Sequence, residues 1–303
     1  MSIAMANQFN VSSASFVTGV PVASDSGWVV MAMDDLAAQE IEHSAILQYR
    51  AGVFEATCIK MFRTRAALWL PGPAEAVFVG DNGECATIDS NGVDRDEYVT
   101  ASERSPRNTG HVRAATRLGD EVIAVGMQRQ VYRRDSAGTW ADMMQGLPGS
   151  GTEGIAGFEC VLAVSASEIY AAGWRGEIWR FDGRSWRPID SPSNKIITGM
   201  CLEPSGTIIA CGQSGLLLRG RDDSWRVVHE GECPTDLWSI DGSTGTVFTA
   251  GLRFFFAVKD GGAELLDLDA QSFGELVHGA GVLWSFGQKD FLAFDGTSWK
   301  RIG

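Results

Sequence analysis

The chain has 303 residues and a formal net charge of −13 at pH 7, and 45% of its residues are apolar. The apolar content suits a globular protein with a substantial core, whereas an acidic surface disfavours nucleic acids and anionic membranes as ligands. The first ten residues hold neither a basic nor a long apolar segment, and no apolar run approaches the ~18 residues of a membrane span. We therefore expect a soluble, cytoplasmic protein without a secretory signal.

Strand-like runs begin early in the chain. Phe16–Val20 suits an innermost strand, and Val30–Asp34 is a second apolar run that ends in an acidic residue. Two more strand-like runs follow, at residues 45–49 and 53–62. These four runs predict one four-stranded unit.

Six further units each contain an apolar run that ends in a glycine. These glycines are spaced by 46, 47, 39, 39 and 36 residues, and they are Gly80, Gly126, Gly173, Gly212, Gly251 and Gly287. Asp34 occupies the equivalent place 46 residues before Gly80. A period near ~40 residues with short strands is typical of propeller blades.

A tryptophan follows four of these glycines by 14, 13, 13 and 12 residues; these are Trp140, Trp186, Trp225 and Trp299. Turn residues before a large aromatic predict a hairpin between the third and fourth strands, with the aromatic packed between blades. The sequence therefore predicts an all-β fold: a single closed β-propeller with seven four-stranded blades, with six as the alternative. We expect residues 14–303 to form this one domain, with its first and last blades in direct contact, and residues 1–13 to be disordered.

The turn before two of the tryptophans resembles a known propeller motif. Asp182-Gly-Arg-Ser-Trp186 and Asp295-Gly-Thr-Ser-Trp299 are similar to the Asp-box of sialidases and BNR-type propellers, although one residue is missing between Asp and Gly. In that family the box is a structural turn remote from any active site. The resemblance therefore implies the fold and not an activity.

Motifs for catalysis and cofactor binding are absent or misplaced. The sialidase signature Phe-Arg-Ile-Pro is not matched, and the nearest string is Phe62–Arg65. Residues 149–154 match Gly-x-Gly-x-x-Gly but follow Leu-Pro and precede a strand-like run, so we interpret them as a loop between blades. A pair of catalytic carboxylates cannot be located from the sequence among 38 acidic residues, so enzymatic activity stays undecided and a binding protein is favoured.

Cysteines and histidines give no sign of a metal site. No cysteine pair has Cys-x-x-Cys spacing, and no histidine is paired with a cysteine at zinc spacing. The cysteines are Cys58, Cys85, Cys160, Cys201, Cys211 and Cys233, and the histidines are His43, His111, His229 and His278. We predict buried, reduced thiols, no metal and no cofactor.

The residues that follow each hairpin glycine vary on a repeated frame, which favours a binding role for the turns between the second and third strands. In a propeller these B–C turns share one face with the D–A loops that join the blades. The predicted partner-binding residues on this face are Asp34, Asp35, Glu40, Asp81, Asn82, Gln128, Trp174, Arg175, Gln213, Arg253, Gln288 and Lys289. Residues 34–43 are expected to form a short acidic helix, with Leu36, Glu40 and His43 on one side.

Three functions remain open from the sequence. A non-enzymatic propeller that binds another protein, as an inhibitor or an immunity-type protein that caps a basic toxin or enzyme, suits the charge and the absence of catalytic motifs. A lectin or glycosidase that uses Trp174 or Trp179 as a stacking platform is the second, and a scaffold subunit of a larger assembly is the third. A monomer is favoured.

Overall fold

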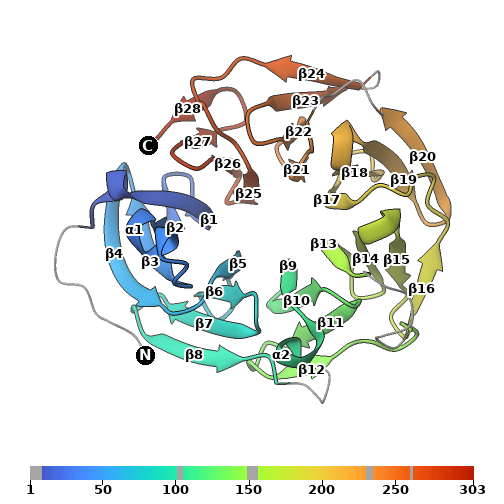
Figure 1. Cartoon of the computed structure of the whole chain (residues 1–303), viewed down its shortest axis with the longest axis horizontal. Helices are drawn as coiled ribbons and strands as arrows, with labels where there is room; N and C mark the ends of the chain where they lie inside the picture. Colours follow the sequence, from blue (N-terminus) through green and yellow to red (C-terminus); the bar gives the residue numbers. More distant parts are fainter. Residues whose placement is uncertain (1–8, 101–104, 149–155, 230–234, 260–261) are drawn as a thin grey trace.

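Seven four-stranded antiparallel sheets stand around a central axis, as Figure 1 shows. The computed structural model describes residues 9–100, 105–148, 156–229, 235–259 and 262–303. The sheets follow one another in chain order, and each is built from four consecutive strands. The prediction of a seven-bladed propeller is confirmed, and the six-bladed alternative is wrong.

The blades are numbered in chain order. Blades 1 and 2 contain β1 (Ala14–Ala23), β2 (Ser26–Met33), β3 (Ser44–Arg50), β4 (Val53–Lys60), β5 (Thr64–Leu70), β6 (Glu75–Gly80), β7 (Glu84–Asp89) and β8 (Asp94–Tyr98). Blades 3 and 4 contain β9 (Val112–Leu118), β10 (Glu121–Gly126), β11 (Gln130–Arg134), β12 (Trp140–Asp142), β13 (Phe158–Ser165), β14 (Glu168–Gly173), β15 (Ile178–Phe181) and β16 (Trp186–Ile189).

Blades 5 to 7 complete the ring. They contain β17 (Ile197–Leu202), β18 (Ile208–Gly212), β19 (Leu217–Arg221), β20 (Ser224–His229), β21 (Ser239–Asp241), β22 (Val247–Ala250), β23 (Phe255–Lys259), β24 (Gly262–Leu266), β25 (Glu275–Gly279), β26 (Val282–Phe286), β27 (Phe291–Phe294) and β28 (Trp299–Arg301). The short helical segments are α1 (Asp34–Ala38), α2 (Pro106–Thr109), η1 (Val11–Ser13), η2 (Trp174–Gly176) and η3 (Gln213–Gly215).

Blades 1 and 7 close the ring by direct contact, in agreement with the sequence prediction (Figure 1). The backbone N–H of Phe16 in β1 donates to the carbonyl of Gln288 in blade 7, at 3.0 Å. The same bond joins other neighbouring blades: Val112 N–H reaches the Asp81 carbonyl at 2.7 Å. The closing contact therefore repeats a contact used elsewhere in the ring.

The core lies between the sheets, and the predicted tryptophans contribute to it. Trp186 of blade 4 is buried, and its Nε1–H donates to the carbonyl of Met143, which follows blade 3, at 2.7 Å. Trp225 of blade 5 contacts Tyr170 of blade 4, and Trp299 of blade 7 contacts Phe248 of blade 6, with ring centroids 6.2 and 5.3 Å apart. The prediction that these aromatics pack between blades is confirmed.

The C–D turns of several blades are held by an aspartate. Asp182 Oδ1 accepts the N–H groups of Arg184 and Ser185 at 2.8 and 2.9 Å, and Asp295 Oδ1 accepts those of Thr297 and Ser298, both at 2.9 Å. The bonds from Ser185 and Arg184 lower the pKa of Asp182. The aspartates thus have a structural role, and the likeness to the Asp-box stays an expectation from the sequence.

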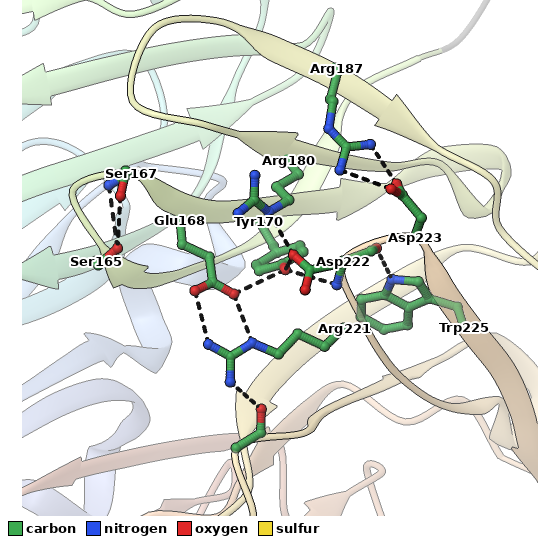
Figure 2. A network of polar contacts seen from close by, with 11 residues as sticks. Ser165, Ser167, Glu168, Tyr170, Arg180, Arg187, Arg221, Asp222, Asp223 and Trp225 are labelled. Atoms are coloured by element: carbon green, nitrogen blue, oxygen red, sulfur yellow. Dashed lines mark hydrogen bonds and ion pairs between the residues drawn. The ribbon is translucent and has the colours of Figure 1, made fainter.

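Blades 4 and 5 are also joined by ion pairs on the face of the A–B and C–D turns (Figure 2). Arg221 binds both oxygens of Glu168 at 2.9 Å, and Arg187 binds Asp223. The hydroxyl of Tyr170 accepts the N–H of Asp222 at 3.1 Å. Since the polar groups pair with one another across the blade boundary, we interpret this network as structural.

Five cysteines, Cys58, Cys85, Cys160, Cys201 and Cys211, are free and buried, as predicted. Burial raises the pKa of Cys58 to about 12 and that of Cys211 to about 11. These thiols therefore stay protonated at neutral pH and behave as apolar core residues. Cys233 and the glycine motif at residues 149–154 lie outside the described residues, as do residues 1–8 of the segment expected to be disordered.

The acidic helix is shorter than predicted. It ends at Ala38, and Glu40 follows with a φ of 58° in the left-handed region. His43 is buried, and its Nε2 accepts the N–H of Met33 at 2.7 Å. Glu40 and His43 therefore do not share a helix face with Leu36, because the histidine instead caps the end of β2.

Candidate functional site

The B–C turns and D–A loops lie on the same face of the ring because neighbouring strands are antiparallel. Backbone hydrogen bonds join the two kinds of segment within blades 2 to 5. The backbone N–H of the residue after the hairpin glycine donates to the backbone carbonyl of the residue that precedes the innermost strand. The donor–acceptor pairs are Asp81–Arg63, Met127–His111, Trp174–Gly157 and Gln213–Ile196, at 2.9–3.1 Å. These bonds fix the turns against the loops, and the two kinds of segment share one face, as the sequence suggested.

Most of the predicted partner-binding residues are exposed on this face. They are Asp35, Glu40, Gln128, Arg175, Gln213, Arg253, Gln288 and Lys289, whereas Asn82 and Asp34 are partly buried. Gln128 and Arg175 have φ values of 57° and 60°. Non-glycine residues in the left-handed region stay there only when the surrounding structure fixes them. The turn tips are therefore defined in conformation.

Two predicted tip residues differ from expectation. Asp81 is buried, because its side chain turns inward toward Arg65, whose Nη2 lies 3.4 Å from Asp81 Oδ2. Trp174 is half-buried rather than exposed, and its Nε1–H donates to Glu159 Oε1 at 2.6 Å. Neither side chain is a freely exposed tip.

Trp179, the other aromatic considered as a stacking platform, is buried. Its Nε1–H donates to Glu177 Oε2 at 3.0 Å, and the guanidinium of Arg129 lies 5.7 Å from the centre of its ring. The ring therefore packs within the protein, and the structure does not bring it to the surface as a sugar platform.

Asp34 and Lys289 come together across the closing blades. Lys289 Nζ lies 2.5 Å from Asp34 Oδ2 and 2.7 Å from the carbonyl of Ala14. The hydrogen bond from Lys289, together with one from Ser15, lowers the pKa of Asp34. These two predicted binding residues thus also hold blade 1 against blade 7.

A channel of about 1250 Å³ runs along the axis and is lined by the innermost strand of each blade. In five blades the innermost strand has a register shift that leaves one residue bulged; the shift follows the first paired residue in blades 2 to 5 and Phe16 in blade 1. The bulged residues are Val17, Arg65, Arg113, Glu159 and Thr198, and all of them line the channel. A bulge redirects a side chain, so the repeated bulge places a different residue type at the same point of each blade.

We call these five residues the bulge ring. They lie at the channel mouth on the B–C/D–A face, since each is near the start of an innermost strand that leads away from that face. Sequence reasoning missed them because the repeats were aligned on the second strand of each blade. Aligning the innermost strands instead gives Thr64-Arg65-Ala66 and Val112-Arg113-Ala114, in which an arginine is the second residue of the strand.

Polar contacts connect the bulge ring to a turn tip. Arg113 Nε donates to Glu159 Oε2 at 2.7 Å, while Glu159 Oε1 accepts the indole N–H of Trp174. The three side chains belong to β9, β13 and the B–C turn of blade 4. Two hydrogen bonds to Glu159 therefore link the turn tip of blade 4 to Arg113 of the ring.

An apolar patch lies at the same channel mouth in blade 6. Trp238, Leu252 and Phe254 are 44%, 59% and 37% exposed. The N–H of Trp238 donates to the Ala250 carbonyl at 2.7 Å, so Trp238 stands beside the turn that carries the other two. Exposed aromatic and aliphatic side chains of this kind are typical of protein interfaces. Arg253 of this turn was singled out from the sequence, but Trp238 was not.

Ionisable groups also line the channel in blades 6 and 7. His278 Nδ1 lies 2.6 Å from Asp241 Oδ2, and this contact raises the pKa of His278. Burial raises the pKa of Glu275 to about 7. Among the described ranges, no group of three or more histidine, cysteine and acidic residues could hold a metal ion.

None of the helices in the described part of the chain is long and apolar enough to cross a membrane. No family model matches the chain. Among solved structures, the WD40 β-propeller domain of Doa1 has a TM-score of 0.68 at 12% identity and covers 92% of both chains. YCF48 bound to a D1 peptide has a TM-score of 0.57 at 15% identity and covers 80% of this chain and 82% of its own. These two similarities support the fold alone.

A curated relative is similar in sequence over almost the whole chain. The immune protein Tsi7 of Pseudomonas aeruginosa is 32% identical over 295 residues, which cover 94% of this chain and 96% of Tsi7. Because this identity extends through all seven blades rather than one repeated unit, the chain belongs to the family of the immune protein Tsi7.

Proposed function

We propose that this protein is an immunity protein that binds a toxin and blocks it through the B–C/D–A face. The observation that carries the proposal is its near full-length similarity to the immune protein Tsi7. The fold adds support, since a closed ring of seven blades offers a rigid surface that needs no ordering when a partner binds.

The chemistry of the face supports a protein partner. Trp238, Leu252 and Phe254 supply exposed apolar area, and Arg175 and Arg253 supply exposed guanidinium groups. Aromatic and arginine side chains are those that contribute most to protein interfaces. We propose that these residues contact the toxin together with Gln128, Gln213 and Gln288.

The charge of the protein supports a basic partner. The formal net charge is −13, and Asp35 and Glu40 are exposed beside the channel mouth. Such a surface attracts a basic protein and speeds its association. We propose that the toxin is basic, and that the immunity protein is a cytoplasmic monomer that meets it there; its buried, free thiols suit a reducing compartment.

Capture of the partner tests this function. The tagged protein is purified from its native host with its bound proteins, and mass spectrometry identifies them. A captured protein that is toxic when expressed alone, and harmless when this protein is co-expressed, supports the proposal. If no captured protein is toxic, or if co-expression gives no protection, the proposed function is wrong.

The face is tested in the same system. Replacing Arg253 and Leu252 with Ala should weaken the complex, whereas replacing Arg184 on the opposite face should not. Each variant is compared by melting temperature, so that a folding defect is recognised. Equal binding by both variants would place the interface elsewhere.

A further inference from the structure

Two arginines of the bulge ring stand on adjacent blades. Arg65 is the bulged residue of β5 and Arg113 that of β9, and both line the channel. Their side chains are 28% and 29% exposed, so each is mostly withdrawn from bulk water yet still accessible. Burial lowers the pKa of Arg65, and the nearby charges of Arg113 and Arg63 lower it further despite the opposing effect of Asp81.

Within the described residues, this group of three arginines is matched by two carboxylates. Arg65 and Arg113 contact Asp81 and Glu159, respectively, and Arg63 lies close enough for its charge to lower the pKa of Arg65. The contact between Arg65 and Asp81 is long at 3.4 Å, and the buried Nε of Arg65 has no hydrogen-bond partner among the described residues. Arg113 donates from its Nε to Glu159 at 2.7 Å. Among the residues that the structure describes, the Nε–H of Arg65 and the Nη groups of Arg113 therefore have no acceptor.

The acceptor that suits them is an anion of defined shape. Guanidinium groups present planar pairs of donors that match the two oxygens of a carboxylate. In the partly buried mouth of the channel such a pair is stronger than on an open surface. The local positive charge is unusual in a protein whose net charge is −13, so general attraction to a basic partner does not explain it.

We propose that Arg65 and Arg113 bind a carboxylate, supplied by an Asp or Glu side chain that the toxin inserts into the channel mouth. Arg63, exposed at the rim, attracts the acidic group as it approaches. The proposal rests on the proposed function for the source of the carboxylate, and on the channel geometry for the binding site itself. A basic toxin with one acidic residue at the centre of its interface would be attracted by the net charge of −13 and would supply a carboxylate to Arg65 and Arg113.

The first experiment tests the site with small probes. Sodium acetate is titrated into the protein at constant ionic strength, with sodium chloride as the reference salt, and the arginine Nε–H signals are followed by NMR. The Arg65 and Arg113 signals should shift and saturate with acetate alone. In Arg65→Gln the acetate-dependent shift of the Arg113 signal should disappear. In Arg184→Gln, a matched loss of charge in an exposed turn of the opposite face, both shifts should persist.

A second variant guards against a folding defect. Arg65→Gln leaves buried Asp81 without its cation, so the double change Arg65→Gln with Asp81→Asn is made as well, and its melting temperature is compared with that of the unchanged protein. If this double variant melts normally and its Arg113 signal still shifts and saturates with acetate, the site assignment is overturned.

The second experiment identifies the source of the carboxylate. With the toxin captured in the test of function, Arg65→Gln should bind about tenfold or more weakly, as expected when a hydrogen bond to a charged group is lost, and Arg184→Gln should bind normally. If inorganic phosphate shifts the two signals at far lower concentration than acetate, and Arg65→Gln binds the toxin normally, the site serves a free anion and the proposal is overturned. If no toxin binds the unchanged protein, the proposed function fails first, and the acetate titration still decides whether the site binds carboxylates.

Discussion

Replacing Trp186 with Ala should destabilise the propeller more than the same change at any other repeat tryptophan. Its side chain is 3% exposed, and its ring packs against Phe181 and Phe158 with centroids 5.4 and 6.2 Å away. Large aromatic truncations in a core cost about 3–5 kcal/mol. Loss of the Nε1–H bond would also leave the carbonyl of Met143 without this donor, which adds about 1 kcal/mol.

Trp299→Ala is the matched comparison. Trp299 contacts Phe248 and Phe255 but is only partly buried, and its Nε1–H has no partner among the described residues. We therefore expect a smaller loss of unfolding free energy, about 2–3 kcal/mol. Trp238→Ala, at an exposed site, should cost less than about 1 kcal/mol.

Urea denaturation followed by circular dichroism measures these differences, with the slope of the transition checked for each variant. The order Trp186, Trp299, Trp238 in decreasing cost is the expected result. Equal losses at all three positions, or a larger loss at Trp238 than at Trp186, would contradict this reasoning. Either result would show that the packing of Trp186 between blades 3 and 4 contributes less to the free energy of unfolding than its contacts imply.

Three further predictions follow from the site. Glu275 has a pKa of about 7 in the folded protein, above its value in the unfolded chain, so the folded state is destabilised as pH rises from the unfolded pKa through 7 and this carboxyl ionises. Glu275→Gln should therefore be more stable than the unchanged protein by about 1–3 kcal/mol at pH 8.5 and nearly equal to it at pH 4.5. Urea denaturation at the two pH values measures this difference. Lys289→Met should remove the closing contact with Asp34, lower stability by about 0.5–1.5 kcal/mol and speed hydrogen exchange in β1; unchanged exchange would contradict this. Charge reversal of Asp35 and Glu40 should slow association with a basic toxin more than it speeds dissociation, and the effect should fade at high salt in stopped-flow measurements.

The blades could be predicted from the sequence because their signal is local. An apolar run before a glycine, as at Gly173 or Gly212, forms one strand and its turn from neighbouring residues alone. Blade 1 was predicted although Asp34 replaces the glycine, since its four apolar runs kept the spacing. The tryptophans likewise follow their turns at a nearly constant distance.

The candidate site was predicted only in part because its decisive features are not local. Whether Asp81 is buried depends on Arg65 from another strand, and whether Trp174 is free depends on Glu159. The bulge at Arg113 arises from the pairing of two strands, and a sequence of alternating residues does not reveal a one-residue shift in that pairing. The face was thus predicted, whereas the ring of side chains at its centre was found in the structure.

The bulge ring, which we propose to contact a partner, stands on a backbone frame that repeats from blade to blade. The bulge ring changes residue type from Val17 to Thr198 while the backbone hydrogen bonds around it repeat from blade to blade. A substitution there alters charge and shape at the channel mouth, and at Arg65 or Arg113 it also removes the ion pair with Asp81 or Glu159. Trp174 is linked to this ring, since its bond to Glu159 couples a turn tip to Arg113. Changes at Trp174 should therefore alter the ring indirectly, and a double-mutant cycle between Trp174 and Arg113 should show coupling in toxin binding that a pair of independent contacts would not.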